Sequence, residues 1–319
     1  MLKKINVNNL RIGMYVILPR SWYEHTFLKS KFAIISEKQI IKIRKMGLEE
    51  VTIDTDKGSD WQDNGSPVSV PDQPVQIIPD ALMEALHDKS LSPSEKAPII
   101  HEQAIVMMQR LLDNPTAENI KTAKKGISEM VNLILTDDST SHHLLLITSH
   151  DYYTFTHSVT VGVLGIALSK FFFKKSNKHD MNELGTGFFL HDLGKVNINQ
   201  DILNKPGRLT DEEMNEVKRH PAQGFKILDE TNQLTEESKL IVLQHHEREN
   251  CKGYPKGLKG EAIHIYGRIC SIADVYDALT SDRPYRKKMA PFAALKLMEE
   301  EMIDHFQQDM FAQFIMIFK

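Results

Sequence analysis

The sequence predicts a mainly α protein, an all-α helical bundle preceded by a small α+β domain. Three observations lead to this prediction. Runs typical of β-strands occur only near the N-terminus. A stretch rich in Gly, Pro, Ser, Asp and Asn then interrupts the chain, and almost every later segment repeats its apolar residues at helical spacing. At 319 residues, the chain is long enough for two domains.

Residues 1–56 form the predicted α+β domain. The segment 10–18 (LRIGMYVIL) is typical of a strand that can bend tightly at Gly13. The segment EKQIIKIRKM then has helical periodicity, with isoleucines on one face, and Gly47 ends this helix. A run typical of a β-strand at 51–53 closes the domain.

Residues 57–79 have the composition of a linker, and residues 80–140 are expected to form a helical connector. Because proline lacks a backbone N–H, Pro93, Pro98 and Pro115 are expected to divide this connector into short helices.

Residues 141–319 form the predicted bundle. The segment 154–173 has two apolar stripes, which indicates a mostly buried helix. A capping box at 210–213 begins another helix, which Pro221 is expected to end just after His220. Two further helices are expected at 234–248 and 262–280.

The bulk composition excludes several classes of protein. A net charge of −4 argues against general affinity for polymeric nucleic acid or anionic membranes, although a local basic patch could bind a small anion. No apolar run is expected to be long enough to insert in a membrane, and the N-terminus lacks the apolar core of a signal peptide. With only Cys251 and Cys270, a disulfide framework is excluded, and we expect a cytoplasmic protein.

Several imidazole and carboxylate side chains fall on apolar helix faces. His157 precedes Val161 by four residues, and His191 follows Phe188 by three. Asp274 lies in an apolar helix interior, where an unpaired carboxylate would be costly. Imidazole and carboxylate groups bind iron, manganese and zinc. Seven such side chains could hold two metals if one aspartate bridges: His157, His191, Asp192, His220, His245, His246 and Asp274.

Each of these residues also has a structural interpretation. His157 alone is typical of a hydrogen-bonded core histidine, and an isolated His-Asp dipeptide arises by chance. His245 and His246 could form a solvated helix end, and Asp274 could pair with an arginine. Taken singly, the structural interpretation is favoured for each. As a set, they favour a metal site because their order and spacing recur in one family.

Residues 141–319 resemble the HD-GYP subgroup of the HD-domain phosphohydrolases, which implies an HD-type helical bundle. The first 56 residues resemble the small uncharacterised domain that often precedes HD-GYP modules. The matching segments of the bundle are YTFTHSVTVG (153–162), HDLGKVNI (191–198), ILNKPGRLTDEE (202–213), RHPAQGFKIL (219–228), HHERENCKGYPKGLKGE (245–261) and IADVYDALTSDRPYRK (272–287).

The resemblance implies two divalent metals, iron or manganese. Asp192 would bridge them. One metal would be held by His157, His191, Asp192 and Asp274, and the other by Asp192, His220, His245 and His246. Some family members bind a third metal through a glutamate four residues before the first histidine. That position is Tyr153 here, so we expect two metals.

The resemblance also implies the substrate contacts. Lys195 matches a lysine placed against the scissile phosphate, although it could instead pair with a ligand carboxylate. Gly253, Tyr254 and Pro255 form the signature loop, in which Tyr254 reaches a substrate phosphate. Arg283 and Arg286 match positions that grip phosphate and guanine. Asp277 matches a carboxylate that supports a ligand or contacts substrate, whereas Arg208, Lys287 and Lys288 are expected to be solvated charges.

Cys251 stands where glycine is more usual in the loop before Gly253. Cysteine tolerates positive φ poorly, so the loop could be altered. We favour a tolerated substitution, and a metal-ligand role is the other alternative.

The implied function is metal-dependent hydrolysis of cyclic di-GMP to pGpG, and further to GMP, by attack of a metal-bridging hydroxide. Lys195, Arg283 and Arg286 would stabilise the developing charge. The alternatives are a weak or inactive binding or scaffold module that contacts a partner such as a diguanylate cyclase, and hydrolysis of another cyclic dinucleotide or a nucleotide.

Overall fold

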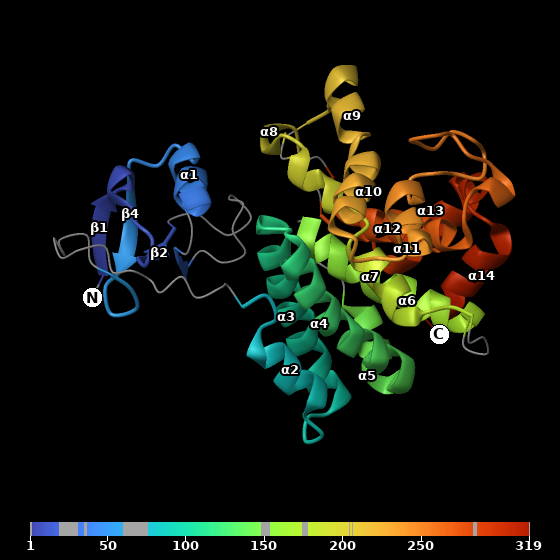
Figure 1. The fold of residues 1–319 in the computed structure, drawn as a ribbon, viewed down its shortest axis with the longest axis horizontal. Helices are drawn as coiled ribbons and strands as arrows, with labels where there is room; N and C mark the ends of the chain where they lie inside the picture. Colours follow the sequence, from blue (N-terminus) through green and yellow to red (C-terminus); the bar gives the residue numbers. More distant parts are fainter. Residues whose placement is uncertain are drawn as a thin grey trace. The chain divides into compact units, whose positions relative to one another are not determined.

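The computed structural model describes residues 2–18, 31–34, 37–59, 76–147, 154–173, 178–203, 205, 207–282 and 286–318. The chain forms two compact units, Met1–Gln76 and Ile77–Lys319 (Figure 1). Each unit has a hydrophobic core of its own. Arg283 and Tyr153 lie outside the described residues, as does most of the expected linker.

Within the described residues, the first unit is a four-stranded antiparallel sheet with one α-helix and one 3-10 helix. The strand order is β1-β4-β2-β3. Its elements are β1 (Leu2–Asn6), the 3-10 helix η1 (Val7–Asn9), β2 (Tyr15–Ile17), β3 (Lys31–Ala33), α1 (Glu37–Lys45) and β4 (Glu50–Asp54). The expected strand at 10–18 is regular only from Tyr15, because Gly13 turns the chain at φ 93° just before it. Gly47, at φ 69°, follows the end of α1 as predicted.

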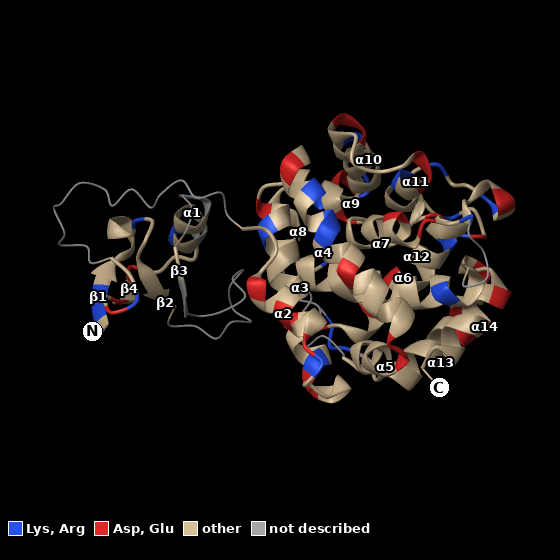
Figure 2. Ribbon diagram, turned by 60° about the horizontal axis from the view of Figure 1, so that its bottom comes forward, with Lys and Arg blue, Asp and Glu red and all other residues tan. Residues whose placement is uncertain are grey.

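The second unit is a helical bundle, as predicted. Its α-helices are α2 (Asp80–His87), α3 (Pro93–Asp113), α4 (Ala117–Thr136), α5 (Asp138–Leu146), α6 (Thr154–Phe173), α7 (Met181–Phe189), α8 (Gln200–Leu203), α9 (Asp211–Val217), α10 (His220–Thr231), α11 (Glu236–Gln244), α12 (Ile265–Thr280), α13 (Pro291–Glu301) and α14 (Gln308–Met316). Short 3-10 segments are η3 (Leu193–Asn197), η4 (Gly260–Ala262) and η5 (Ile303–His305). Figure 2 shows Lys and Arg interspersed with Asp and Glu over these helices.

Helices α2 to α5, which cover the expected connector, share one core with the later helices. Leu111 of α3, Ile127 of α4 and Phe188 of α7 are all fully buried in the same cluster. The stretch 80–140 is therefore an integral part of the second compact unit rather than a separate spacer.

Two proline predictions were wrong. Pro98 does not divide the connector, because α3 continues from Pro93 to Asp113 with Pro98 inside it. The one backbone hydrogen bond that Pro98 removes is offset by burial of neighbours such as Ala97 and Ile100. Pro221 does not end a helix either: α9 ends at Val217, and Pro221 lies in the first turn of α10, where no N–H is needed.

Helix α6 lies at the centre of the bundle. It packs on α3, α4, α7 and α12, and the rings of Phe188 and Phe189 lie directly against its glycines Gly165 and Gly162. With 20 residues and a mean hydropathy of 1.3, α6 is long and apolar enough to cross a membrane, contrary to the sequence expectation. Of the apolar 18-residue stretch of α6, 72% is buried inside the unit, and this burial explains why the helix is apolar.

Candidate active site

Five helices bring the seven expected ligands together. His157 lies in the first turn of α6, His191 and Asp192 follow α7, and His220 begins α10. His245 and His246 follow α11, while Asp274 lies inside α12. The ligands therefore cluster mainly at helix ends, where the backbone can change direction.

Gly194 explains how the segment after α7 reaches α10. A Cβ at this position would overlap the carbonyl oxygen of His220 and lie 2.6 Å from the amide nitrogen of Gly224. Only glycine lets η3 pack directly on the first turn of α10. This contact brings Asp192 beside His220.

The first group of ligands surrounds one oxygen of Asp192. His157 Nε2 lies 3.5 Å from Asp192 Oδ2 and 3.2 Å from Asp274 Oδ1. His191 Nε2 lies 3.6 Å from Asp192 Oδ2 and 3.1 Å from His157 Nε2. Candidate ligand atoms of His157, His191 and Asp192 all lie within 4.8 Å of one another.

The second group surrounds the other oxygen of Asp192. His220 Nε2 and His245 Nε2 lie 3.2 and 3.7 Å from Asp192 Oδ1, and they lie 3.1 Å from each other. His246 completes this group, in which the candidate ligand atoms again lie within 4.8 Å of one another. His246 Nδ1 is also 3.4 Å from Asp274 Oδ2. Asp192 thus turns one oxygen toward each group.

In four of the histidines, the hydrogen bond made by Nδ1 determines which tautomer is present. An unprotonated carboxylate or carbonyl oxygen can only accept a hydrogen bond, so the Nδ1 atom facing it carries the proton. Each Nε2 therefore presents a lone pair, and two pairs of Nε2 atoms face each other at 3.1 Å. A shared cation would remove this repulsion. The Nδ1 partners are Asp277 Oδ2 for His157 (2.6 Å), Phe188 O for His191 (2.8 Å), Val217 O for His220 (2.7 Å) and Val242 O for His245 (2.9 Å).

Burial favours the neutral form of His191, His245 and His246. It lowers the pKa of His191 to about 4 and the pKa values of His245 and His246 well below their ordinary value. Burial alone would raise the pKa values of Asp192 and Asp274. The charge of Lys195 beside Asp192, and the interactions of His246 and His157 with Asp274, outweigh burial together with the other neighbouring histidines. Both pKa values therefore lie well below the ordinary range.

Asp192 Oδ1 makes no hydrogen bond to any residue that the structure describes, although Asp192 is only 1% exposed. A buried acceptor without a donor needs another partner. Neutral imidazoles and ionised carboxylates are suitable ligands for a divalent metal, so the residues present fit such an ion.

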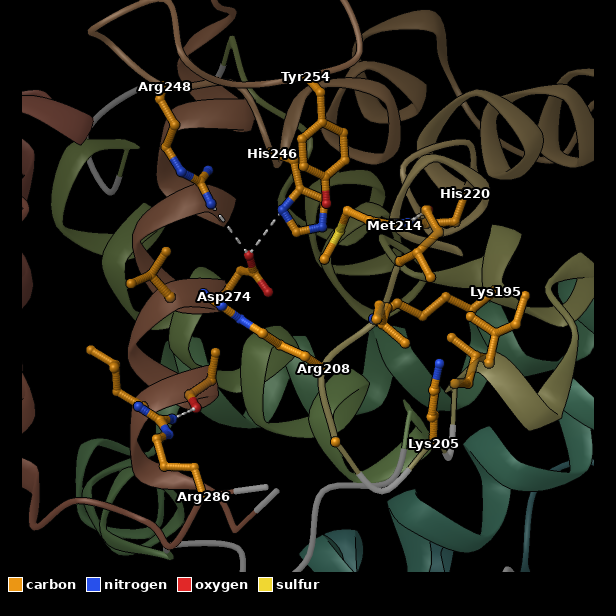
Figure 3. A pocket seen from close by; sticks show the side chains of 18 of the residues that line it. Lys195, Lys205, Arg208, Met214, His220, His246, Arg248, Tyr254, Asp274 and Arg286 are labelled. Atoms are coloured by element: carbon orange, nitrogen blue, oxygen red, sulfur yellow. Dashed lines mark hydrogen bonds and ion pairs between the residues drawn. The ribbon is translucent and has the colours of Figure 1, made fainter. Parts of the chain in front are cut away.

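A pocket of about 660 Å³ opens beside these ligands (Figure 3). Apolar side chains such as Met214 and Leu279 form part of its wall. Its cationic lining residues are Lys195, Lys205, Arg208, Arg248 and Arg286. The pocket therefore has the charge to receive an anion and the apolar area to receive a ring system.

The loop after α11 holds Tyr254 over the ligands. The Tyr254 ring stacks on the His246 ring, with centroids 4.5 Å apart, and its hydroxyl points into the pocket in Figure 3. The Glu247 carboxylate anchors the loop by accepting hydrogen bonds from the N–H groups of Lys256 (2.7 Å) and Leu258 (2.8 Å). Gly253 permits close packing, since an added Cβ would lie 2.5 Å from the carbonyl oxygen of His246.

The expected substrate contacts fall in different places. Lys195, Tyr254 and Arg286 line the pocket. Gly253 and Pro255 belong to the loop that carries Tyr254 and are not among the residues that line the pocket. Asp277 is 1% exposed and lies behind His157, away from the pocket, because its carboxylate accepts the His157 Nδ1 hydrogen bond. This position suits the alternative of supporting a ligand rather than contacting substrate. Arg283 lies outside the described residues.

Cys251 has a φ of 64°, the positive value that its replacement of a glycine suggested. Its N–H donates to Arg248 O at 3.0 Å, so the turn forms despite the Cβ. The Cys251 side chain is exposed, and within the described residues neither group of candidate ligands includes it.

Three cationic lining residues were not expected at the site. Arg248 lies 3.8 Å from Asp274 Oδ2 and donates to Ser271 Oγ at 2.6 Å. Lys205 is paired with Glu213, and Arg208, expected to be an ordinary solvated charge, is exposed but borders the pocket (Figure 3). Of the three, only Arg248 had a signal in the sequence, because it lies close to the His245-His246 pair.

Two family models match the chain. The "HD domain" family model matches residues 163–310, and the "Domain of unknown function (DUF3391)" model matches residues 2–136. The chain is 33% identical to the cyclic di-GMP phosphodiesterase PA4108 of Pseudomonas aeruginosa, over 99% of this chain and 76% of that protein.

Other relatives match over shorter regions. The cyclic di-GMP phosphodiesterase response regulator RpfG of Xanthomonas campestris is 50% identical over 33% of this chain and 28% of its own length. The 3'3'-cGAMP-specific phosphodiesterase 1 of Vibrio cholerae is 31% identical over 56% of this chain and 39% of its own length. The solved structure of Bd1817, an HDG"Y"P protein from Bdellovibrio bacteriovorus, shares the fold with a TM-score of 0.65, at 20% identity over 99% of both chains.

A helical bundle that gathers these histidines and aspartates around a pocket defines the HD-domain class of phosphohydrolases. Within that class, the chain belongs to the HD-GYP family of phosphodiesterases, with the domain of unknown function at its N-terminus. The sequence prediction of this family, and of an enzyme, is confirmed.

Proposed function

We propose that this protein hydrolyses cyclic di-GMP to linear pGpG at a centre of two divalent cations. The observation that carries the proposal is the position of Asp192, which turns one oxygen toward each of two histidine groups beside a cation-lined pocket. We further propose that the reaction takes place in the cytoplasm, in keeping with two free cysteines.

One cation would be held by His157, His191, Asp192 and Asp274, and the other by Asp192, His220, His245 and His246. The grouping of candidate ligand atoms within 4.8 Å supports this assignment for every residue except Asp274. Asp274 is assigned because its Oδ1 lies 3.2 Å from His157 Nε2. Mixed imidazole and carboxylate ligands suit iron or manganese. When bound, a pair of such cations lowers the pKa of water and neutralises phosphate oxygens.

Lys195 has two roles in this proposal. Its Nζ lies 2.5 Å from Asp192 Oδ2, so it compensates the charge of the bridging carboxylate. Lys195 also lines the pocket, and an ammonium group has three donors. A second donor can therefore stabilise the charge that grows on the scissile phosphate.

Tyr254 and Arg286 would hold the substrate. The Tyr254 hydroxyl can donate to a phosphate oxygen because burial raises its pKa and keeps the phenol protonated. Arg286, whose guanidinium donates to the carbonyl of Ala278, keeps other N–H groups for phosphate or guanine. Arg283, which lies outside the described residues, would share this role.

The substrate assignment rests on pocket chemistry and on the relatives. A cyclic dinucleotide combines two phosphates with two purine rings, and the pocket combines cations with apolar walls in about 660 Å³. Matched relatives are named for cyclic di-GMP and for 3'3'-cGAMP. Hydrolysis of 3'3'-cGAMP is therefore the second candidate.

The test compares both substrates on protein prepared without oxygen and loaded with Fe²⁺ or Mn²⁺. We expect conversion of cyclic di-GMP to pGpG, followed by slower formation of GMP, both resolved by chromatography. Faster turnover of 3'3'-cGAMP would assign the second candidate. Tight binding of cyclic di-GMP without turnover would contradict the proposal and favour a scaffold that contacts a partner such as a diguanylate cyclase.

A further inference from the structure

His101 of α3 is a half-buried side chain that the site described above does not use. Its Nε2 atom is shielded from solvent and makes no hydrogen bond within the described residues. Burial lowers the pKa of His101 to about 4, whereas the nearby charge of Asp277 acts to raise it. The ring is therefore neutral at physiological pH, and its buried Nε2 still requires a hydrogen-bond partner.

A small cavity adjoins His101. Its volume is about 10 Å³, which is about the space needed for one water molecule. The cavity has apolar walls from α5 and α6, including Leu144 and Leu164. Its polar lining residues are His101, Thr160, Asp277 and Thr280. A buried water is stable only when two to four polar groups surround it, and the polar residues that line this cavity can supply them.

Asp277 connects this cavity with the candidate metal centre. Its Oδ2 accepts the hydrogen bond from His157 Nδ1 at 2.6 Å, and its Oδ1 accepts one from Ser281 Oγ at 3.1 Å. A carboxylate oxygen can accept more than one hydrogen bond. A water in the cavity can therefore accept from His101 and donate to Asp277, while the Thr280 hydroxyl, which already donates to Tyr276 O at 2.9 Å, can accept its other proton.

We propose that His101 is a positioning residue of the active site, which acts through one buried water and Asp277 to orient His157 toward its metal. The inference rests on the metal centre proposed above. Helix α3 lies within residues 2–136, the match to the domain of unknown function. The region matched by that domain would thus help to orient a ligand of the first metal site, in addition to preceding the catalytic bundle.

The experiment measures Mn²⁺ binding to the full chain by electron paramagnetic resonance, which distinguishes free from bound ion. His101→Leu removes the hydrogen bonds and keeps similar bulk, while His101→Gln keeps a polar group at the same place. His142→Leu makes the same chemical change at an exposed position of α5 and serves as the matched control. Thermal unfolding of each metal-free variant checks the fold.

We expect His101→Leu to weaken one of two Mn²⁺ sites by roughly 10-fold, the lower end of the range for groups that orient metal ligands. The other site should keep its affinity, because His220, His245 and His246 do not depend on Asp277. His101→Gln and His142→Leu should bind both ions as the unmodified chain does. General destabilisation would not weaken Mn²⁺ binding at one site only in His101→Leu and leave it normal in His101→Gln.

Unchanged binding by His101→Leu, equal weakening of both sites, or an equal loss in His101→Gln would overturn the role of His101. If His101→Leu does not fold, a crystal structure of the unmodified chain decides, since a dry cavity beside His101 also overturns the proposal. An unmodified chain that binds no Mn²⁺ would instead overturn the metal centre itself, so the two failures are distinguishable.

Discussion

His157 Nδ1 donates to Asp277 Oδ2 across 2.6 Å and joins the first turn of α6 to the last turn of α12. Both side chains are about 1% exposed, so water does not compete with this contact. The bond fixes the His157 tautomer and directs Nε2 toward Asp192 and Asp274.

Asp277→Asn should therefore weaken the first metal site. An amide can turn its NH₂ group toward His157 Nδ1 and stabilise the wrong tautomer. We expect metal affinity at that site to fall by about 10- to 100-fold. Competition with a chelator, followed by metal analysis, measures the change. Asp309→Asn, at an exposed position of α14, is the control. Equal metal retention by both variants would show that the contact does not orient His157.

Asp192→Ala should remove both metals and all measurable hydrolysis, because each metal loses the ligand that joins the two groups. Metal content per chain and turnover of cyclic di-GMP provide the two measurements. Asp201→Ala, at an exposed position of α8, controls for loss of an aspartate. Retention of two metals by Asp192→Ala would rule out a bridging carboxylate.

Tyr254→Phe should keep both metals and weaken catalysis. The substitution removes the hydroxyl and preserves the ring that stacks on His246. Loss of a hydrogen bond to a charged phosphate corresponds to about 1.5–3 kcal/mol, or roughly 10- to 150-fold in kcat/KM. Steady-state kinetics and metal content are measured on the same preparation. A variant with normal kinetics, or one that loses metal, would contradict the separation of ligand and substrate roles.

The metal-free protein should lose stability as the pH falls from about 6.5 to about 4. Burial lowers the pKa of His191 to about 4, so within this window the unfolded chain binds a proton that the folded chain does not. Protonation thus favours unfolding, by about 3 kcal/mol for this group once the pH is below 4. Urea unfolding at several pH values measures the slope.

His191→Phe should flatten this pH dependence by about one proton, because a phenyl ring does not titrate. His142→Phe, on the surface of α5, should leave the slope unchanged. The same slope in all three proteins would mean that His191 is not neutral in the folded metal-free state.

The sequence by itself was sufficient to predict the mainly α fold and to select the histidines and aspartates that the structure brings together as candidate metal ligands. His157 and Asp274 occupy apolar helix faces, and that pattern is local, so it can be recognised without knowing which helices meet. The capping box of α9 and the turn at Gly47 are local for the same reason. Predictions failed where packing overrides local preference, as at Pro98, which remains inside α3 because its neighbours are buried.

Only the tertiary structure decided how these residues are used. It brings both oxygens of Asp192 between two histidine groups, turns Asp277 away from the pocket, and adds Arg248 and Arg208 to the pocket lining. It also brings His101 beside Asp277, although 176 positions separate them in the sequence. Helical periodicity specifies which face of a helix is buried, whereas the partner of that face depends on contacts between distant segments.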